Sequence, residues 1–218
     1  MKNKQMSETL TVALLITFSG GLQDAYTYFA RDHVFANAQT GNIVLMGAHL
    51  LDGEFAVTLH YLFPVLSFAV GVFVAEQIQA HYKEAKKLHW RQIVLLMEII
   101  ALTVSSFFNE NLNLVANSLV SFSCALQVQA FRSTHGYPYA STMCIGNMRS
   151  GVSALSGYIR THEKEDLRRA WHYFLVILTF AVGATFGYWL LPHFGYSTIL
   201  VSSVLLIVAT LIMFINND

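Results

Sequence analysis

The chain has 218 residues and no net formal charge, and 55% of its residues are hydrophobic while only 12% are charged. A soluble domain carries about 25% charged residues, so the composition excludes an ordinary soluble domain and indicates a polytopic membrane protein. Without a net positive charge, the chain has no basic surface that would attract nucleic acid.

Six apolar segments are long enough to cross about 30 Å of hydrocarbon as helices. We expect them at about 8–30, 56–81, 89–109, 112–134, 168–192 and 196–216. Two weaker segments, at about 34–52 and 137–159, are apolar overall but carry polar residues and glycines in their first halves. The topology depends on whether these two segments cross the membrane or enter and leave on one side.

The second half of the chain repeats the first. The matching segments are Gly21-Leu22-Gln23 with Ala125-Leu126-Gln127, Phe35-Ala36 with Tyr139-Ala140, Thr40-Gly41-Asn42 with Ile145-Gly146-Asn147, and HYLFPVLSFAVG from His60 with HYFLVILTFAVG from His172. We therefore treat residues 1–218 as a single membrane domain, with repeat 1 at about 8–109 and repeat 2 at about 112–216.

The lysine and arginine positions distinguish the two topologies, because short cytoplasmic loops accumulate these residues. One basic group runs from Lys83 to Arg91 and another from Arg160 to Arg169. If all the segments crossed, these groups would face opposite sides. If the two weaker segments are re-entrant, both groups and both termini are cytoplasmic. We therefore predict six transmembrane helices and two re-entrant, broken segments.

Each repeat then has three crossing helices, and an odd number of crossings gives the two repeats opposite orientations. The predicted fold is an all-α integral membrane protein of two inverted-topology repeats (3+3). The two re-entrant segments would approach each other near the middle of the membrane, and the Gly-Asn steps are the expected meeting point. This plan recurs in transporters and in some channels.

Two charged residues are candidates for function. Asp24 lies two-thirds of the way along the first predicted span, where a buried carboxylate costs about 3 kcal/mol or more. It either binds a proton or cation on a transport path, or lies near the outer headgroups, or belongs to a structural pair. Arg149 lies in the second re-entrant segment, where it pairs with Asp24, attracts an anionic solute, or extends to the cytoplasmic face.

The repeated Gly-Asn steps are candidates for ligand contact. Glycine permits close backbone approach, and asparagine can cap a half-helix whose N-terminus carries a partial positive charge. The alternative is that the glycines only allow helices to pack closely. The residues predicted to line a pathway or to contact a ligand are Gln23, Asp24, Asn37, Gln39, Thr40, Gly41, Asn42, Gln127, Gln129, Gly146, Asn147 and Arg149.

No pattern of catalytic or metal-binding residues is found. The chain has no H-E-x-x-H, Walker or G-x-S-x-G motif, and Cys124 and Cys144 lie in apolar segments typical of core cysteines. We therefore expect no enzymatic activity, no metal site and no cofactor.

The chain resembles the YoaK-like family of bacterial membrane proteins, a family of unknown function. The resemblance rests on Gly21-Leu22-Gln23-Asp24-Ala25, on Phe35 followed by Thr40-Gly41-Asn42, and on Gln127 in the second half. It covers essentially the whole chain, although the second-half pattern of the family, Gln-Asn-Ala and a Thr-Gly step, is replaced here by other residues. The resemblance implies a bacterial inner-membrane location and no established activity.

From these observations we expect a small-solute transporter or channel with its pathway at the interface between the repeats. The alternative is a non-transporting integral membrane protein that scaffolds or regulates a partner. The expected partners are the lipid bilayer and a small solute or ion, with no nucleic acid, and a homo-oligomer is compatible with the sequence. Both termini are expected on the cytoplasmic side of the bacterial inner (plasma) membrane.

Overall fold

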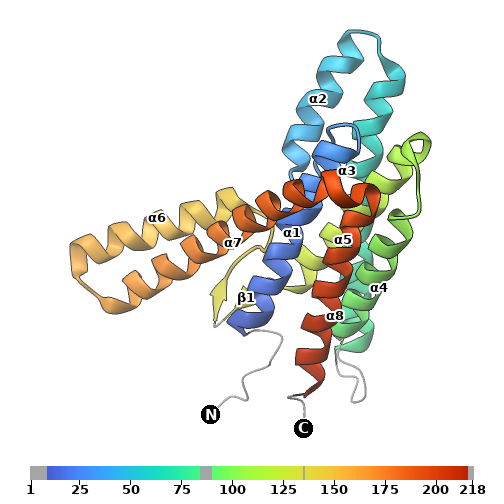
Figure 1. Ribbon diagram of the computed structural model, residues 1–218. Helices are drawn as coiled ribbons and strands as arrows, with labels where there is room; N and C mark the ends of the chain where they lie inside the picture. Colours follow the sequence, from blue (N-terminus) through green and yellow to red (C-terminus); the bar gives the residue numbers. More distant parts are fainter. Residues whose placement is uncertain (1–8, 84–89, 135, 216–218) are drawn as a thin grey trace.

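The computed structural model describes residues 9–83, 90–134 and 136–215, and it is almost entirely helical (Figure 1). The expected cytoplasmic placement of Lys86, Lys87 and the two chain ends lies outside the described residues. The helices are α1 Leu10–Ala30, α2 Gln39–Leu51, α3 Phe55–Tyr82, α4 Trp90–Ser105, α5 Asn113–Ala130, α6 Cys144–Thr161, α7 Lys164–Phe194 and α8 Ile199–Ile215.

Short elements connect some of these helices. Glu110–Leu112 and Gly195–Thr198 form 3₁₀ turns before α5 and α8. Between α5 and α6, the strands β1 Ser133–Thr134 and β2 Tyr137–Pro138 pair antiparallel, with Ser133 opposite Pro138. The apolar pattern of the sequence does not predict this small hairpin.

Two helical stretches among the described residues are long and apolar enough to cross a membrane. They are Phe55–Tyr82, with a mean hydropathy of 1.9, and Lys164–Met213, with a mean hydropathy of 2.2. The helices α4 and α8 are shorter, with 16 and 17 residues. Large apolar side chains such as Phe73 and Trp189 are exposed on α3 and α7, as on a surface that contacts lipid or another protein.

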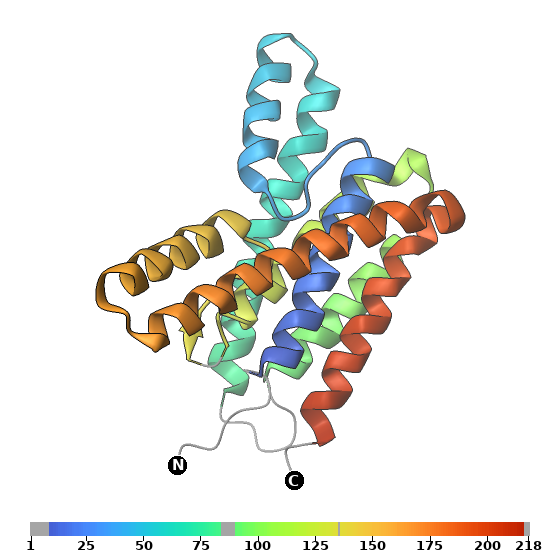
Figure 2. The ribbon, with the colours of Figure 1, turned by 60° about the vertical axis from the view of Figure 1, so that its left-hand side comes forward.

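The helices form one bundle with two projecting arms (Figures 1 and 2). In the bundle, α1 packs mainly on α7, α3 packs on α5, and α4 packs on both α5 and α8. One arm consists of α2 with the first half of α3, and the other of α6 with the first half of α7. Each arm therefore joins a short helix to the start of a long helix that continues into the bundle.

Glycines allow the two main helix pairs to cross at very short distances. A Cβ atom added to Gly183 of α7 would lie 2.2 Å from the backbone oxygen of Phe18 in α1. A Cβ atom added to Gly71 of α3 would lie 2.6 Å from the backbone oxygen of Phe122 in α5. Any larger residue would therefore push the paired backbones apart, because native Cβ atoms do not approach backbone oxygens this closely.

A buried arginine fixes the end of α1 to the α4–α5 connection. Arg31 is 0% exposed and its guanidinium stacks 3.8 Å from the ring centre of Tyr196. The guanidinium donates hydrogen bonds to the hydroxyl of Tyr26, to the backbone oxygens of Ser105, Phe108 and Asn109, and to Oδ1 of Asn113. The Arg31 side chain thereby supplies hydrogen-bond donors to the carbonyl groups at the end of α4 and in the connection that follows it.

The connection between α1 and α2 turns back along α1 rather than continuing away from it. Asp32 and His33 adopt positive φ angles of 63° and 56°, which reverse the chain just after α1. Figure 2 shows the connection returning toward the bundle before α2 begins. The result is an irregular stretch followed by the helix α2, within the segment expected at about 34–52.

Candidate functional site

Two connecting segments from different halves of the chain converge on Gly20, near the middle of α1. From the α1–α2 connection, Asn37 donates a hydrogen bond through its Nδ2 to the backbone oxygen of Gly20 at 3.2 Å. From the α5–α6 connection, the methyl group of Thr142 lies 2.6 Å from where a Cβ atom of Gly20 would be. A side chain at Gly20 would displace Thr142 from this position. We use the name polar centre for the polar residues around Gly20, which are Ser19, Gln23, Asp24, Asn37, Glu98, Cys124, Gln127, Ser141 and Thr142.

Asp24 lies one helical turn beyond Gly20 and binds the α1–α2 connection. Its Oδ1 accepts a hydrogen bond from the backbone N–H of Asn37 at 2.9 Å. No ion pair joins Asp24 to Arg149 among the residues that the structure describes. The ion pair between Asp24 and Arg149, one of the three alternatives predicted for Arg149, is therefore not formed in this structure.

Gln23 joins three helices at the polar centre. Its Nε2 donates to Ser19 Oγ at 3.0 Å and to Glu98 Oε1 of α4 at 3.3 Å. Its Oε1 accepts a hydrogen bond from the Cys124 thiol of α5 at 2.9 Å. All of these side chains are fully buried, so α1, α4 and α5 share one sealed polar layer.

Gln127, the repeat counterpart of Gln23, binds the α5–α6 connection. Its Nε2 donates to Ser141 Oγ at 2.8 Å, and Gln127 is itself fully buried. Four buried oxygens of the polar centre have no hydrogen-bond partner among the described residues: Asn37 Oδ1, Glu98 Oε2, Gln127 Oε1 and Thr142 Oγ1. Such atoms are rare in native proteins, where an ordered water or ion often supplies the missing hydrogen bond.

The two asparagines of the Gly-Asn steps hold their own connections. Asn42 bonds both backbone groups of Phe35, through Oδ1 at 3.0 Å and Nδ2 at 2.6 Å. Asn147 bonds both backbone groups of Ala140 in the same way, at 3.4 and 2.7 Å. The separation along the chain is the same in both cases, so the two connections are local copies of one structure.

Three details of the Gly-Asn interpretation are wrong. The N-cap residues of α2 and α6 are Ala38 and Met143, not the asparagines, and neither makes a side-chain capping bond. Within the described helices, α2 and α6 make no extensive contact with each other. Gly146 has open space around it, and Gly41 contacts only the ring of Phe35, so neither glycine brings two helices together.

The remaining predicted residues lie at the edges of the polar centre or outside it. Gln39 donates to the backbone oxygen of Ala36 and accepts from Asn42, while Thr40 is exposed. Gln129 donates to Glu76 of α3 and accepts from Arg132 at 2.7 Å. Arg149 is exposed on α6 and lines a separate cleft with α7.

The structure adds residues that the sequence pattern did not single out as site residues. Ser141 and Thr142 carry the second connection to the polar centre, and Ser19 and Gly20 sit beside Gln23 on α1. Cys124, expected as a core residue, is buried and free as predicted but also binds Gln23. Ser19 and Glu98 are polar residues within apolar segments, and this feature could have drawn attention to them.

A helical bundle with apolar outer faces and a buried polar layer defines the class of helical integral membrane proteins. The chain belongs to the family described as "Protein of unknown function (DUF1275)", whose profile matches residues 12–212. It is also similar to the UPF0700 transmembrane protein YoaK of Bacillus subtilis (strain 168), with 26% identity over 205 residues covering 90% of each chain. These matches confirm the predicted family resemblance and the membrane setting. No solved structure matches the chain.

Proposed function

We propose that the protein is a small-solute transporter or channel whose pathway passes through the polar centre around Gly20. The observation that carries this proposal is the convergence of two connecting segments on a buried layer with four unpartnered oxygens. Irregular backbone at membrane depth persists where protein or a water-filled path satisfies its polar groups. Because Gln23, Gln127 and Cys124 are all 0% exposed, the pathway is closed at its midpoint in this conformation.

The proposal includes the inverted-repeat architecture, which the helix pairing supports. The first crossing helix of the first half, α1, packs on the second crossing helix of the second half, α7, and in the same way α5 packs on α3. The contacts of α4 with α5 and of α8 with α1 are likewise equivalent. Gly71 and Gly183, which match in sequence, approach the backbone oxygens of Phe122 and Phe18, which also match. A two-fold exchange of the halves accounts for all of these pairs.

The six crossing helices and the cytoplasmic termini are also part of the proposal. In both ribbon views, α1 begins and α8 ends at the end of the bundle where α3 ends and α4 begins (Figures 1 and 2). This arrangement supports one common side for both termini and the first basic linker. The re-entrant reading is supported by Asn37, which lies beyond the end of α1 in sequence yet bonds to Gly20 in its middle.

The native cysteine of the polar centre provides a test of the pathway. We expect Cys124, in full-length protein with Cys144→Ser in liposomes, to react with a small water-soluble methanethiosulfonate reagent. The reaction requires the closed layer to open, so it should be slow but complete within the life of the sample, and mass spectrometry of the intact protein measures it.

A buried cysteine outside the pathway provides the matched control. Ala209 of α8 is also 0% exposed, and Ala209→Cys in a background lacking both native cysteines should stay unmodified until the protein is denatured. A sealed scaffold or regulatory protein predicts that Cys124 and the Ala209→Cys thiol are equally inert. Equal inertness of the two thiols would contradict the transport proposal.

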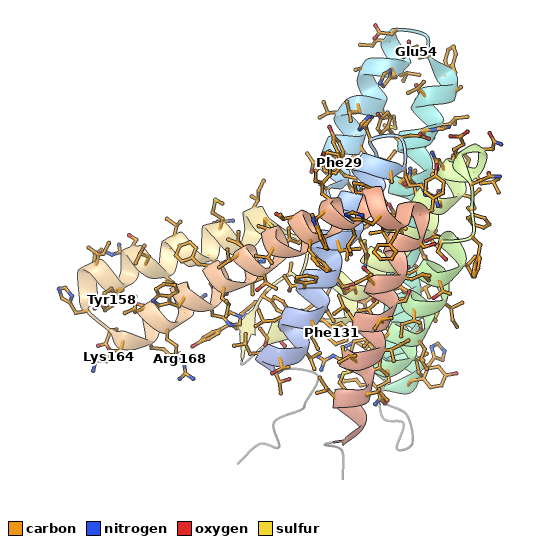
Figure 3. All side chains as sticks on the ribbon, viewed as in Figure 1. Phe29, Glu54, Phe131, Tyr158, Lys164 and Arg168 are labelled. Carbon is orange, nitrogen blue, oxygen red and sulfur yellow. The ribbon has the colours of Figure 1, made fainter. Side chains whose placement is uncertain are left out.

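The topology has a separate test in whole cells. Single cysteines replacing Lys83 and Lys164, introduced one at a time without the native cysteines, should both resist a membrane-impermeant maleimide added from outside and react after permeabilisation. Figure 3 shows Lys164 at the outer end of the α6–α7 arm, so its surroundings do not block the reagent. Labelling of only one site from outside would place the two basic linkers on different sides and exclude the inverted arrangement.

A further inference from the structure

The arm formed by α6 and the first half of α7 carries a polar cleft that is distinct from the polar centre. The cleft has a volume of about 420 Å³ and lies between the two helices. The residues that line it include Arg149, Ser150, Ser153, Arg160, Asp166 and Arg169. These residues come from both helices of the arm, so the cleft depends on their packing and is not a feature of one helix alone.

The cleft has an excess of positive charge with no internal partner. Three guanidinium groups, of Arg149, Arg160 and Arg169, face a single carboxylate, that of Asp166. Within the described part of the chain, no ion pair shorter than 4.0 Å joins any of these arginines to an acidic residue. Like charges that share a cleft repel one another, and a bound anion would convert this repulsion into attraction.

The donors in the cleft suit a phosphate group. The guanidinium group presents its N–H donors in a planar fork that binds the oxygens of phosphate in pairs. The hydroxyl groups of Ser150 and Ser153 provide further donors at the same wall. Arg149 and Arg160 from α6 and Arg169 from α7 therefore place guanidinium donors on both walls of the cleft.

The surroundings of the cleft favour a phosphate carried by a lipid. On α6, Ile145, Val152 and Ile159 are 85%, 53% and 66% exposed, and on α7 Trp171 is 68% exposed. These exposed apolar side chains stand on the same two helices that form the basic cleft, and basic pockets between helices bind lipid headgroups at a membrane surface. Figure 3 shows Lys164 and Arg168 at the same end of the arm, where they extend the positive surface.

We propose that the α6–α7 cleft binds the phosphate of an anionic phospholipid headgroup through Arg149, Arg160 and Arg169. The site is separate from the proposed transport pathway and does not depend on transport activity. A soluble phosphate ester has the same recognition chemistry, and the experiment below separates the two sources.

The test uses purified full-length protein in a neutral detergent, with bound molecules counted by native mass spectrometry. The probes are phosphatidylglycerol, phosphatidylcholine as the neutral lipid, and glycerol phosphate as the soluble ester. We expect wild-type protein to retain phosphatidylglycerol in preference to phosphatidylcholine. The triple variant Arg149→Gln, Arg160→Gln, Arg169→Gln should bind it at least tenfold more weakly, since each basic residue near an anionic surface contributes roughly fivefold.

The matched control is Arg132→Gln, which removes an exposed arginine at the end of α5 and should leave the preference unchanged. All three cleft arginines are exposed, so the triple variant should fold normally, and its elution volume checks this. The wild-type preference is measured without any variant. Binding of glycerol phosphate alone would assign the site to a soluble ester rather than a lipid. Equal retention of phosphatidylglycerol by the wild-type and triple-variant proteins, or no preference for any phosphate probe, would overturn the proposal.

Discussion

Replacing Arg31 with methionine is expected to lower the melting temperature of the purified protein by about 10 °C, at roughly 2–4 °C per kcal/mol. The substitution removes one donor from each of five acceptors. The backbone oxygens of Ser105 and Asn109 keep a backbone N–H donor, whereas the backbone oxygen of Phe108, Asn113 Oδ1 and the Tyr26 hydroxyl lose the donor that Arg31 provides. Unsatisfied buried acceptors cost about 1–3 kcal/mol each, partly relieved by local rearrangement, so we expect a total near 4 kcal/mol. Thermal unfolding in detergent, followed by intrinsic fluorescence, measures the change.

The control for Arg31 is another arginine just after a helix end. Arg132 follows α5, and its side chain is 65% exposed and lies 3.7 Å from Glu76. Because exposed ion pairs contribute at most about 1 kcal/mol, Arg132→Gln should shift the melting temperature by less than about 3 °C. Similar shifts for the two variants would mean that the Arg31 network does not hold α1 to the α4–α5 connection. Arg31→Lys should fall between them, because an ammonium group cannot reach all five acceptors.

The second large effect is expected at the crossing of α1 and α7. In Gly183→Ala the new methyl carbon would lie 2.2 Å from the backbone oxygen of Phe18, and a backbone atom cannot move aside as a side chain can. We expect a loss of about 3 kcal/mol, the upper range for overpacking, together with reduced recovery of monodisperse protein in size-exclusion chromatography. In Gly71→Ala the new methyl carbon would lie 2.6 Å from the backbone oxygen of Phe122, so this variant should also be less stable than the wild type, by a smaller amount.

A glycine without close neighbours provides the comparison for these substitutions. Gly47 lies inside α2, and a Cβ atom added there would meet nothing within 4 Å. Gly47→Ala should therefore keep or raise the melting temperature, since alanine is favoured over glycine in a helix by about 0.5–1 kcal/mol. If Gly183→Ala and Gly47→Ala behave alike, the close crossing of α1 and α7 is not required for stability.

The sequence predicted the long helices well because their apolar runs are uninterrupted. The spans expected at about 56–81 and 196–216 correspond to α3 at Phe55–Tyr82 and α8 at Ile199–Ile215. The span expected at about 89–109 ends earlier, since α4 stops at Ser105. The carbonyl groups freed there are bound by Arg31, a contact from a distant part of the chain that local sequence does not reveal.

The two weaker segments were harder to predict because only the later part of each is helical. Apolar content suggested continuous segments at about 34–52 and 137–159, but helix begins only at Gln39 and at Cys144. The stretches before these two helix starts are irregular and are held by side-chain hydrogen bonds from Asn42 and Asn147. These bonds match Phe35 with Ala140 rather than with Tyr139. The extra residue of the second half therefore lies before Ala140, on the side of the β1–β2 hairpin.

The sequence predicted some residues of the candidate site but not the contacts that bring them together. Gln23, Asp24, Asn37 and Gln127 do meet around the middle of α1. The meeting itself depends on Gly20 and Thr142, whose small size and position become meaningful only once the α5–α6 connection is placed. Tertiary contact between distant segments determines this, and no periodicity along the chain encodes it.

The crossed pairing of α1 with α7 and of α3 with α5 has a consequence for biogenesis. During synthesis, α1 is complete long before α7 has left the ribosome, so the face of α1 that packs on α7 must stay unoccupied or be shielded by a chaperone until then. Neither half has its own partner for its first helix, and an isolated half would leave that face bare. Assembly is therefore completed only at the end of translation, when the last helices close around the first.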